Sequence, residues 1–230
     1  MNSLRKIALV GGGEFRPGCE VMDRAILDAT GADRPSVVVV PTAAAAQRPD
    51  KAASNGVAYF NSLGAQAKPL MVLDSEDAND AALVSEVDSA DLTYLTGGSP
   101  SHLLEVLRGS LFLDTLVESL ERGAVVAGSS AGAMVLGEWM WYKGWDEALG
   151  LVPGIVILPH HESAEPDSVS RELDGSAPTG AVVLGIDART GVLAGPEGWT
   201  VLGTGGVTVY TGREWQRFAA GNTMPKYLSS

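Results

Sequence analysis

Hydrophobic and polar positions alternate regularly along the first two thirds of the chain, where short apolar runs are separated by longer amphipathic segments. The apolar runs are bounded by Gly, Pro or Asp and predict buried strands at 6–10, 36–41, 67–73, 91–95 and 124–128. Between them, apolar residues recur every three or four positions and predict helices at 19–29, 50–64, 80–90, 101–108 and 111–122.

Strands that are apolar throughout are typical of a parallel sheet with helices on both faces. Because crossovers between parallel strands are right-handed, this part of the chain predicts an α/β fold with a doubly wound, mostly parallel sheet. The last third has shorter apolar runs at 154–159, 181–187, 190–194, 199–203 and 207–210. They predict a final strand and a C-terminal antiparallel extension, with 162–180 as an exposed loop containing one helical turn. Since there is no internal repeat and no linker, we expect residues 1–230 to form a single domain.

Composition and charge narrow the classes of partner. The net charge of −12 argues against nucleic acid or a membrane surface, because binding to phosphates depends on clustered Lys and Arg. A single cysteine, Cys19, excludes an intramolecular disulfide and a multi-cysteine zinc site. We expect neither metal nor cofactor. The first apolar run is too short for a signal peptide and no run approaches the roughly 20 residues that cross a bilayer, which predicts a cytoplasmic protein.

Four loops rich in Gly or other small residues follow predicted strands: GGGEF (11–15), PTAAAA (41–46), TGGSP (96–100) and GSSAGA (128–133). Ligands bind beyond the carboxyl ends of such strands, so these loops predict one active-site edge. The last loop contains Gly-x-Ser-x-Gly centred on Ser130, the pattern of a nucleophile elbow. Gly128 and Gly132 provide the small flanking positions that a sharp strand-to-helix turn needs. The N–H of Ala131, at the start of the predicted helix, is available to an oxyanion.

A serine nucleophile needs a base to accept its proton. The chain has three histidines, His102, His160 and His161. His102 lies early in a predicted helix, where a surface histidine is common. His160 and His161 follow the apolar run 154–159, so they emerge at the end of a strand that could lie beside the elbow. Either of the two is a candidate base.

The stretches VVAGSSAGAMVLGE (125–138), LPHHE (158–162) and YLTGGSPSHL (94–103) resemble the peptidase S51 family, which includes dipeptidase E and cyanophycinase. The resemblance implies a class I glutamine amidotransferase-like fold with a flavodoxin-like core. It also implies that Ser130 is the nucleophile and that His160, directly after a proline, is the general base. Gly98 in the Gly-Gly turn would supply a second oxyanion-hole amide beside Ala131.

The resemblance does not identify the acidic residue that orients the histidine. The cyanophycinase-like branch has a glutamate directly after Gly-Ile-Asp, and Ala188 stands there in this chain. Asp187, the adjacent residue, is our candidate, although in a regular strand its side chain would point to the opposite face. Other carboxylates close in sequence to the predicted site remain open as alternatives: Asp146, Glu147, Glu162 and Glu165.

These residues predict a serine hydrolase that cleaves a small peptide or amide through an acyl-enzyme. Family substrates often carry an aspartate at the scissile position, which would require a cation from the nearby loops: Arg16, Lys143, Arg171 or Arg189. Two alternatives are an amidase or esterase acting on a small metabolite, and a binding module whose catalytic site has decayed. The aromatic segment EWMWYKGW (138–145) is expected to pack over the site or to form a homodimer contact.

Overall fold

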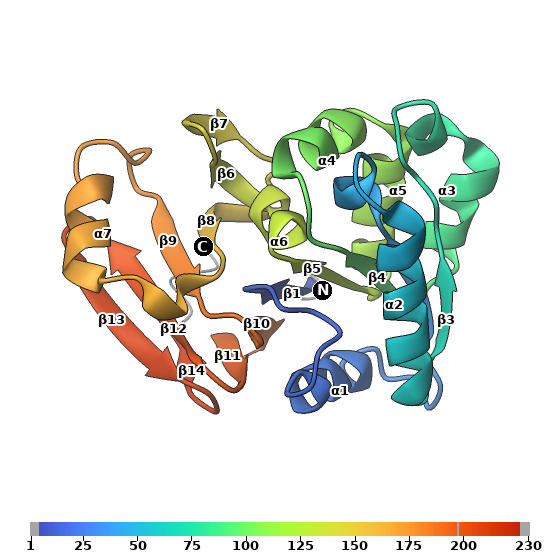
Figure 1. The fold of residues 1–230 in the computed structure, drawn as a ribbon, viewed down its shortest axis with the longest axis horizontal. Coiled ribbons are helices and arrows are strands. Elements are labelled where there is room, and N and C mark those ends of the chain that lie inside the picture. Colours follow the sequence, from blue (N-terminus) through green and yellow to red (C-terminus); the bar gives the residue numbers. More distant parts are fainter. Residues whose placement is uncertain (1–4, 197, 226–230) are drawn as a thin grey trace.

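The computed structural model describes residues 5–196 and 198–225, and its core is an eight-stranded sheet (Figure 1). Its order is β14-β11-β10-β1-β5-β4-β2-β3. The strands are β1 (Lys6–Val10), β2 (Ser36–Val40), β3 (Gln66–Pro69), β4 (Leu92–Leu95), β5 (Val125–Ser129), β10 (Thr190–Gly195), β11 (Gly198–Gly203) and β14 (Thr223–Met224). Strands β1 to β5 are parallel, whereas β10, β11 and β14 are antiparallel to their neighbours. The predicted fold class, a mostly parallel α/β sheet with an antiparallel extension, is confirmed.

Alternate side chains of the central strands enter two separate cores, because successive residues of a strand face opposite sides of the sheet. Ala8 and Val39 pack with the helices α1 (Glu20–Asp28) and α2 (Pro49–Ser62). Leu9 and Val38 pack on the other face. The helices there are α3 (Ala81–Asp88), α4 (Pro100–Leu107), α5 (Leu111–Glu121) and α6 (Ala131–Leu136). Both faces are therefore covered, which explains why these strands are apolar throughout.

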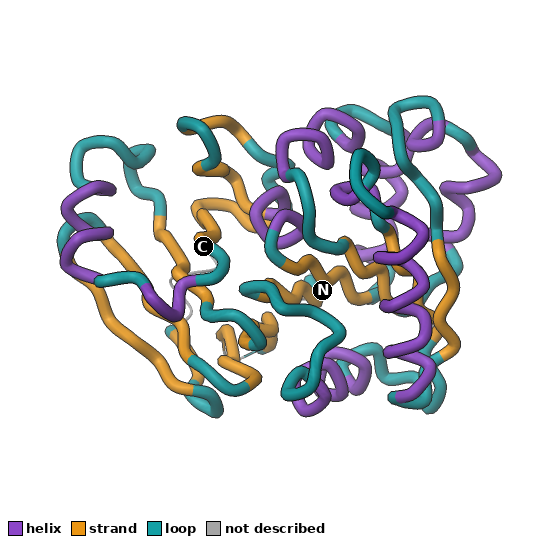
Figure 2. The backbone as a smooth tube through the Cα atoms, in the orientation of Figure 1, coloured by secondary structure: helices purple, strands orange, loops and turns teal. Residues whose placement is uncertain are grey.

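A second, six-stranded sheet lies at the left of Figure 1 in the order β13-β12-β9-β8-β6-β7. Its strands are β6 (Gly137–Trp141), β7 (Trp145–Glu147), β8 (Val152–Leu158), β9 (Val182–Ile186), β12 (Gly206–Thr211) and β13 (Glu214–Ala219). Figure 2 shows that α7 (Pro166–Leu173) lies at this end, and α7 packs against β13. The sequence pattern did not predict a separate sheet, since it placed 154–159, 181–187 and 207–210 beside the parallel strands.

Smaller differences have local causes. The strand expected at 67–73 ends at Pro69, and the Leu70 N–H makes one more bond to β2, to the carbonyl oxygen of Val39 at 2.9 Å. Proline is tolerated at position 69 because β3 is an edge strand and this position has no N–H to pair on its open side. The segment 162–180 holds the eight-residue helix α7 and a 3₁₀ turn, η3 (His161–Ser163), which is more structure than the expected single turn. Two further 3₁₀ turns are η1 (Thr42–Ala44) and η2 (Asp77–Asn79). Within the described residues, the helices are all too short or too polar to cross a membrane.

Candidate active site

Ser130 occupies the sharp turn between β5 and α6, with the strained backbone angles φ 49° and ψ −109°. A non-glycine residue rarely adopts a positive φ, and such strain is concentrated at functional sites. The turn needs both flanking glycines: a Cβ at Gly128 would lie 2.4 Å from the carbonyl oxygen of Gly132, and a Cβ at Gly132 would lie 2.3 Å from that of Leu95. The Ser130 N–H donates to the carbonyl oxygen of Val10 at 2.9 Å, which ties the turn to the end of β1. This is the geometry of a nucleophile elbow.

The imidazole of His160 lies against this serine, with 3.1 Å between Ser130 Oγ and His160 Nε2. His160 has a left-handed backbone conformation (φ 54°), and its N–H donates to the carbonyl oxygen of Gly11 at 2.8 Å. The ring packs closely against Gly12, where a Cβ would be 2.2 Å from Cε1 of the imidazole. The preceding strand, β8, belongs to the second sheet and does not pair with β5, but it packs against α6, the helix that follows the elbow. The loop after β1 then fixes the histidine beside the serine.

The neighbouring His161 points away from the serine into the second sheet. It is buried, and its Nε2 lies 2.6 Å from the hydroxyl of Tyr210 in β12. Its ring fills the space where a Cβ at Gly185 would lie, 2.4 Å from Cδ2. Burial lowers the pKa of His161 below its ordinary value. Of the two candidate bases, the structure brings His160 to Ser130.

The structure places Asp187 in the second sheet and does not join it to His160. The residue is 4% exposed, and its carboxylate accepts the Gly206 N–H at 2.9 Å and forms an ion pair with Arg217. Glu162 is different, because its Oε2 accepts the N–H of Ala188 at 2.9 Å. This hydrogen bond, assisted by the charge of His160, holds the pKa of Glu162 below its ordinary value.

The remaining carboxylates proposed from the sequence lie elsewhere. Asp146 and Glu147 belong to β7, where Asp146 forms an ion pair with Arg108 and the Glu147 carbonyl oxygen accepts from the same arginine. Glu165 is the residue that precedes α7. Among the described residues, no hydrogen bond joins any carboxylate to His160.

The two predicted oxyanion-hole residues follow β4 and β5. Ala131 is the first residue of α6, and the first N–H groups of a helix have no partner within it. Gly98 has φ 146° and packs so closely on η1 that a Cβ would lie 2.1 Å from the carbonyl oxygen of Ala43. Over residues 5–196 and 198–225, neither the Gly98 N–H nor the Ala131 N–H donates to a protein acceptor. Both amides are therefore available to a ligand.

Glu14 is a residue of this region that sequence reasoning did not single out. Its two carboxylate oxygens accept from the Gly97 N–H and from the Ser129 hydroxyl, each at 2.9 Å. The motif GGGEF identified the loop, but it contained no signal for the direction of the glutamate side chain. With the Ser99 N–H donating to the carbonyl oxygen of Ala43 at 2.7 Å, all four predicted loops meet at this edge of the sheet.

One of the candidate cations, Arg189, borders the same edge. Its N–H donates to the carbonyl oxygen of Gly12 at 2.7 Å, and its Cγ lies 3.3 Å from the position of a Cβ at Gly13. Arg171 bonds the Asp167 carbonyl oxygen within α7, and Lys143 lies over the ring of Tyr142. Arg16 is exposed on the loop after β1.

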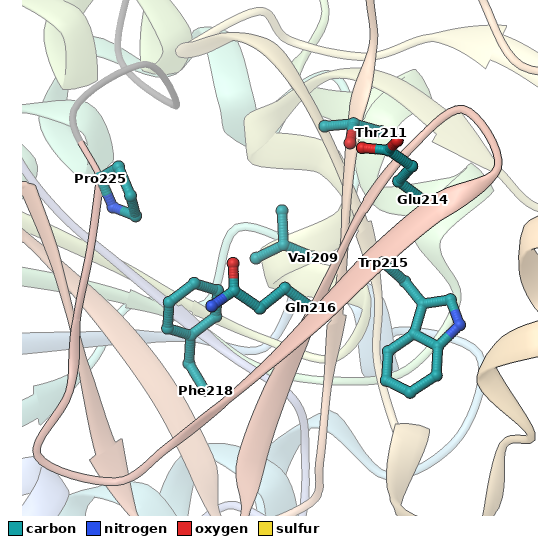
Figure 3. A pocket seen from close by; sticks show the side chains of 7 residues that line it. All are labelled: Val209, Thr211, Glu214, Trp215, Gln216, Phe218 and Pro225. Atoms are coloured by element: carbon teal, nitrogen blue, oxygen red, sulfur yellow. The ribbon is translucent and has the colours of Figure 1, made fainter.

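A surface pocket lies on the second sheet, where Figure 3 shows side chains of β12 and β13 around it. Val209, Trp215 and Phe218 are among the residues that line it. This pocket shares no residue with the edge that carries Ser130 and His160. The candidate active site is the edge of the first sheet where Ser130 and His160 meet, and this pocket is separate from it.

A strained serine at a strand-to-helix turn, with a histidine beside it, is typical of hydrolases with a nucleophile elbow. The model of peptidase family S51 matches residues 7–195 of the chain. The chain belongs to peptidase family S51, and it is an enzyme, a peptidase.

Two solved structures agree with this family. The crystal structure of a peptidase from an acI-B1 Actinobacterium is 28% identical in sequence, with a TM-score of 0.87 over 97% of this chain and 98% of that chain. A putative peptidase E protein from Listeria monocytogenes EGD-e is 16% identical, with a TM-score of 0.61 over 95% of this chain and 100% of that chain. The second likeness concerns the fold alone. No curated protein gives a significant match.

Proposed function

We propose that this peptidase is a serine enzyme that cleaves a small peptide or amide through an acyl-enzyme on Ser130. The observation that carries the proposal is the 3.1 Å contact between Ser130 Oγ and His160 Nε2, made by a serine with φ 49°. Such a contact lies within the distance that proton transfer to a general base requires. The side chain of Ser130 is half-buried and that of His160 is exposed, so a substrate can reach the pair.

In the proposed reaction, Ser130 Oγ attacks the carbonyl carbon of the scissile bond and His160 Nε2 accepts the hydroxyl proton. The N–H groups of Gly98 and Ala131 donate to the carbonyl oxygen as it becomes negatively charged. When the carbon–nitrogen bond breaks, His160 returns the proton to the leaving amine. Water then attacks the acyl-enzyme, again with His160 as base, and releases the acid product and the free serine.

We propose Glu162, in place of Asp187, as the carboxylate that supports the histidine. It lies two residues after His160, and its oxygen accepts the N–H of Ala188. Position 188 is where the cyanophycinase-like branch has its glutamate, so a carboxylate from residue 162 reaches the backbone of that position. The pKa of Glu162 is lowered first by hydrogen bonds from the N–H groups of Ala188 and of Glu162 itself, and further by the nearby His160 and Arg189.

For the substrate we propose a short peptide with an acidic residue at the scissile position. Arg189 is the cation that supports this specificity, because it borders the loop that holds His160. This preference is measured as kcat/KM on a panel of Asp-X dipeptides, matched Asn-X dipeptides and simple esters. We expect kcat/KM to favour Asp-X over Asn-X by about 10-fold or more. Turnover of esters with no peptide turnover would instead support the alternative of an esterase.

The experiment that tests the mechanism is labelling with a fluorophosphonate, which reacts with an activated serine and releases fluoride. We expect the wild-type protein to be labelled on the peptide that contains Ser130, and Ser130→Ala to abolish both labelling and peptide cleavage. Ser85→Ala is the control, because it removes an exposed hydroxyl on α3 and leaves the nucleophile and its surroundings unchanged. Labelling of Ser130→Ala at the wild-type rate would remove Ser130 from its proposed role.

A further inference from the structure

The Glu14 side chain connects two loops that are far apart in the sequence. Its Oε1 accepts the Gly97 N–H at 2.9 Å, and its Oε2 accepts the Ser129 hydroxyl at 2.9 Å. Gly97 directly precedes Gly98, and Ser129 directly precedes the Ser130–Ala131 turn. One carboxylate thus touches both stretches that carry the proposed oxyanion-hole amides.

The Glu14 carboxylate lies close to Ser130, but it is not bonded to His160 and so does not have the place of a triad acid. A Cβ at Gly97 would lie 2.9 Å from Glu14 Oε1 and 3.4 Å from the Cβ of Ser130, so the three groups share one small space. The described hydrogen bonds of Glu14 go to Gly97 and Ser129, and His160 is bonded to Ser130 instead. Because the Gly97 N–H is already paired with Glu14, the free donor of the Gly-Gly turn is the N–H of Gly98.

We propose that Glu14 is a positioning residue that sets the distance between the Gly98 and Ala131 amides. The inference rests on the proposed function, since it assumes that these amides bind the oxyanion. Hydrogen-bond donors of an oxyanion hole act only where they are held at the position of the developing charge. A side chain that bonds to both loops supplies this constraint without touching the substrate.

Two conservative variants separate the reach of the side chain from its charge. Glu14→Gln removes the charge but keeps the length: its oxygen can accept the Gly97 N–H, and its amide can donate to Ser129 Oγ. Glu14→Asp keeps the charge but is shorter by one methylene, so it cannot hold both loops in place. If positioning is the role, the glutamine variant is active and the aspartate variant is impaired.

We expect Glu14→Ala and Glu14→Asp to lower kcat by about 10- to 100-fold, with KM changed by less than about 3-fold, because misplaced oxyanion donors affect the transition state. Glu14→Gln should stay within about 5-fold of wild-type kcat. Glu20→Gln is the control, since Glu20 lies near the same loop and accepts the Gly18 N–H at 2.7 Å, outside the site. Wild-type activity in Glu14→Asp together with loss in Glu14→Gln would show that charge, and not reach, is required, and would overturn the proposal.

A second measurement does not depend on activity. Amide hydrogen exchange at Gly97 should become about 10-fold faster in Glu14→Ala than in the wild type, and should change little in Glu14→Gln. Unchanged exchange in Glu14→Ala would overturn the connection itself. If Ser130→Ala is still labelled by the fluorophosphonate, the proposed function fails. If labelling depends on Ser130 but is equally fast in all Glu14 variants, only the positioning role fails.

Discussion

Two residues of the site, Ser130 and His160, have positive φ angles of 49° and 54°. A non-glycine residue in this region costs about 1–3 kcal/mol and persists only where the surroundings hold it. The end of β1 provides that support, because Val10 and Gly11 accept the N–H groups of Ser130 and His160. Strain at both residues is therefore balanced by the same short segment.

The first prediction concerns Gly12, on which the His160 ring lies. Gly12→Ala should lower kcat/KM by about 100-fold or more, because the new Cβ would lie 2.6 Å from Nε2 and must displace the imidazole from Ser130. Steady-state kinetics and fluorophosphonate labelling measure the loss.

Gly31→Ala is the matched control for Gly12→Ala. Gly31 also has a positive φ, 81°, but a Cβ there would meet nothing within 4 Å. It should lower stability by about 1 kcal/mol through backbone strain and leave kcat/KM unchanged. Equal activity of the two variants would contradict the role assigned to Gly12.

The second prediction tests the carboxylate that we assign to the histidine. Glu162→Gln should lower kcat by about 10-fold, less than the roughly 10⁴-fold loss for a buried triad acid, because this carboxylate is exposed to solvent. The substitution keeps the size of the side chain, so the melting temperature should change little. A wild-type kcat in this variant would exclude Glu162 from the reaction.

Asp187 has a structural role, because it connects strands of the second sheet. Its carboxylate, at the end of β9, bonds to Gly206 of β12 and to Arg217 of β13. It thus holds three adjacent strands together, through a carboxylate that is buried while the Arg217 side chain is 44% exposed.

The third prediction follows from this connection. Asp187→Asn should lower the free energy of unfolding by about 1–2 kcal/mol, because the exposed Arg217 can return to water, and should keep kcat within about 3-fold of the wild type. Urea denaturation and steady-state kinetics measure the two effects. Asp174→Asn is the comparison, because it breaks an exposed ion pair with Arg213 and should cost less than about 1 kcal/mol. A large loss of kcat in a stable Asp187→Asn protein would return Asp187 to the active site.

Sequence patterns predicted the parallel core well, because strands such as Val37–Val40 are apolar on both faces and their helices are amphipathic. They missed β13, since its residues are mostly exposed and include charged Glu214 and Arg217, which leaves no apolar alternation to detect. They also missed β6, β7 and β14. The contacts of Glu14 and Glu162 depend on tertiary packing between distant loops, so no local pattern contains them.

The single domain, the homodimer and the cytoplasmic location stay predictions.

At the scale of the whole molecule, the buried Asp23 affects the pH dependence of folding. Asp23 lies on α1 with no exposed surface, and its Oδ2 accepts the hydroxyl of Tyr59 on α2 at 2.8 Å. Among the described residues its Oδ1 has no hydrogen-bond partner. Burial raises the pKa of this carboxyl to about 7.

The last prediction is the effect of this shift on stability. Between the unfolded pKa, about 4, and the folded pKa, the folded state keeps a proton that the unfolded state has lost, so the stability contributed by Asp23 falls as pH rises through this window. The neutral variant Asp23→Asn does not titrate. Relative to the wild type it should therefore gain stability between pH 5 and pH 8, by on the order of a few kcal/mol. Urea denaturation across this range measures the difference in stability between Asp23→Asn and the wild type. Buried His161 also makes stability depend on pH, but it is present in both proteins and its contribution cancels in this difference. Asp28→Asn, exposed on the same helix, should show no such trend, and a difference between Asp23→Asn and wild type that does not change with pH would contradict the raised pKa.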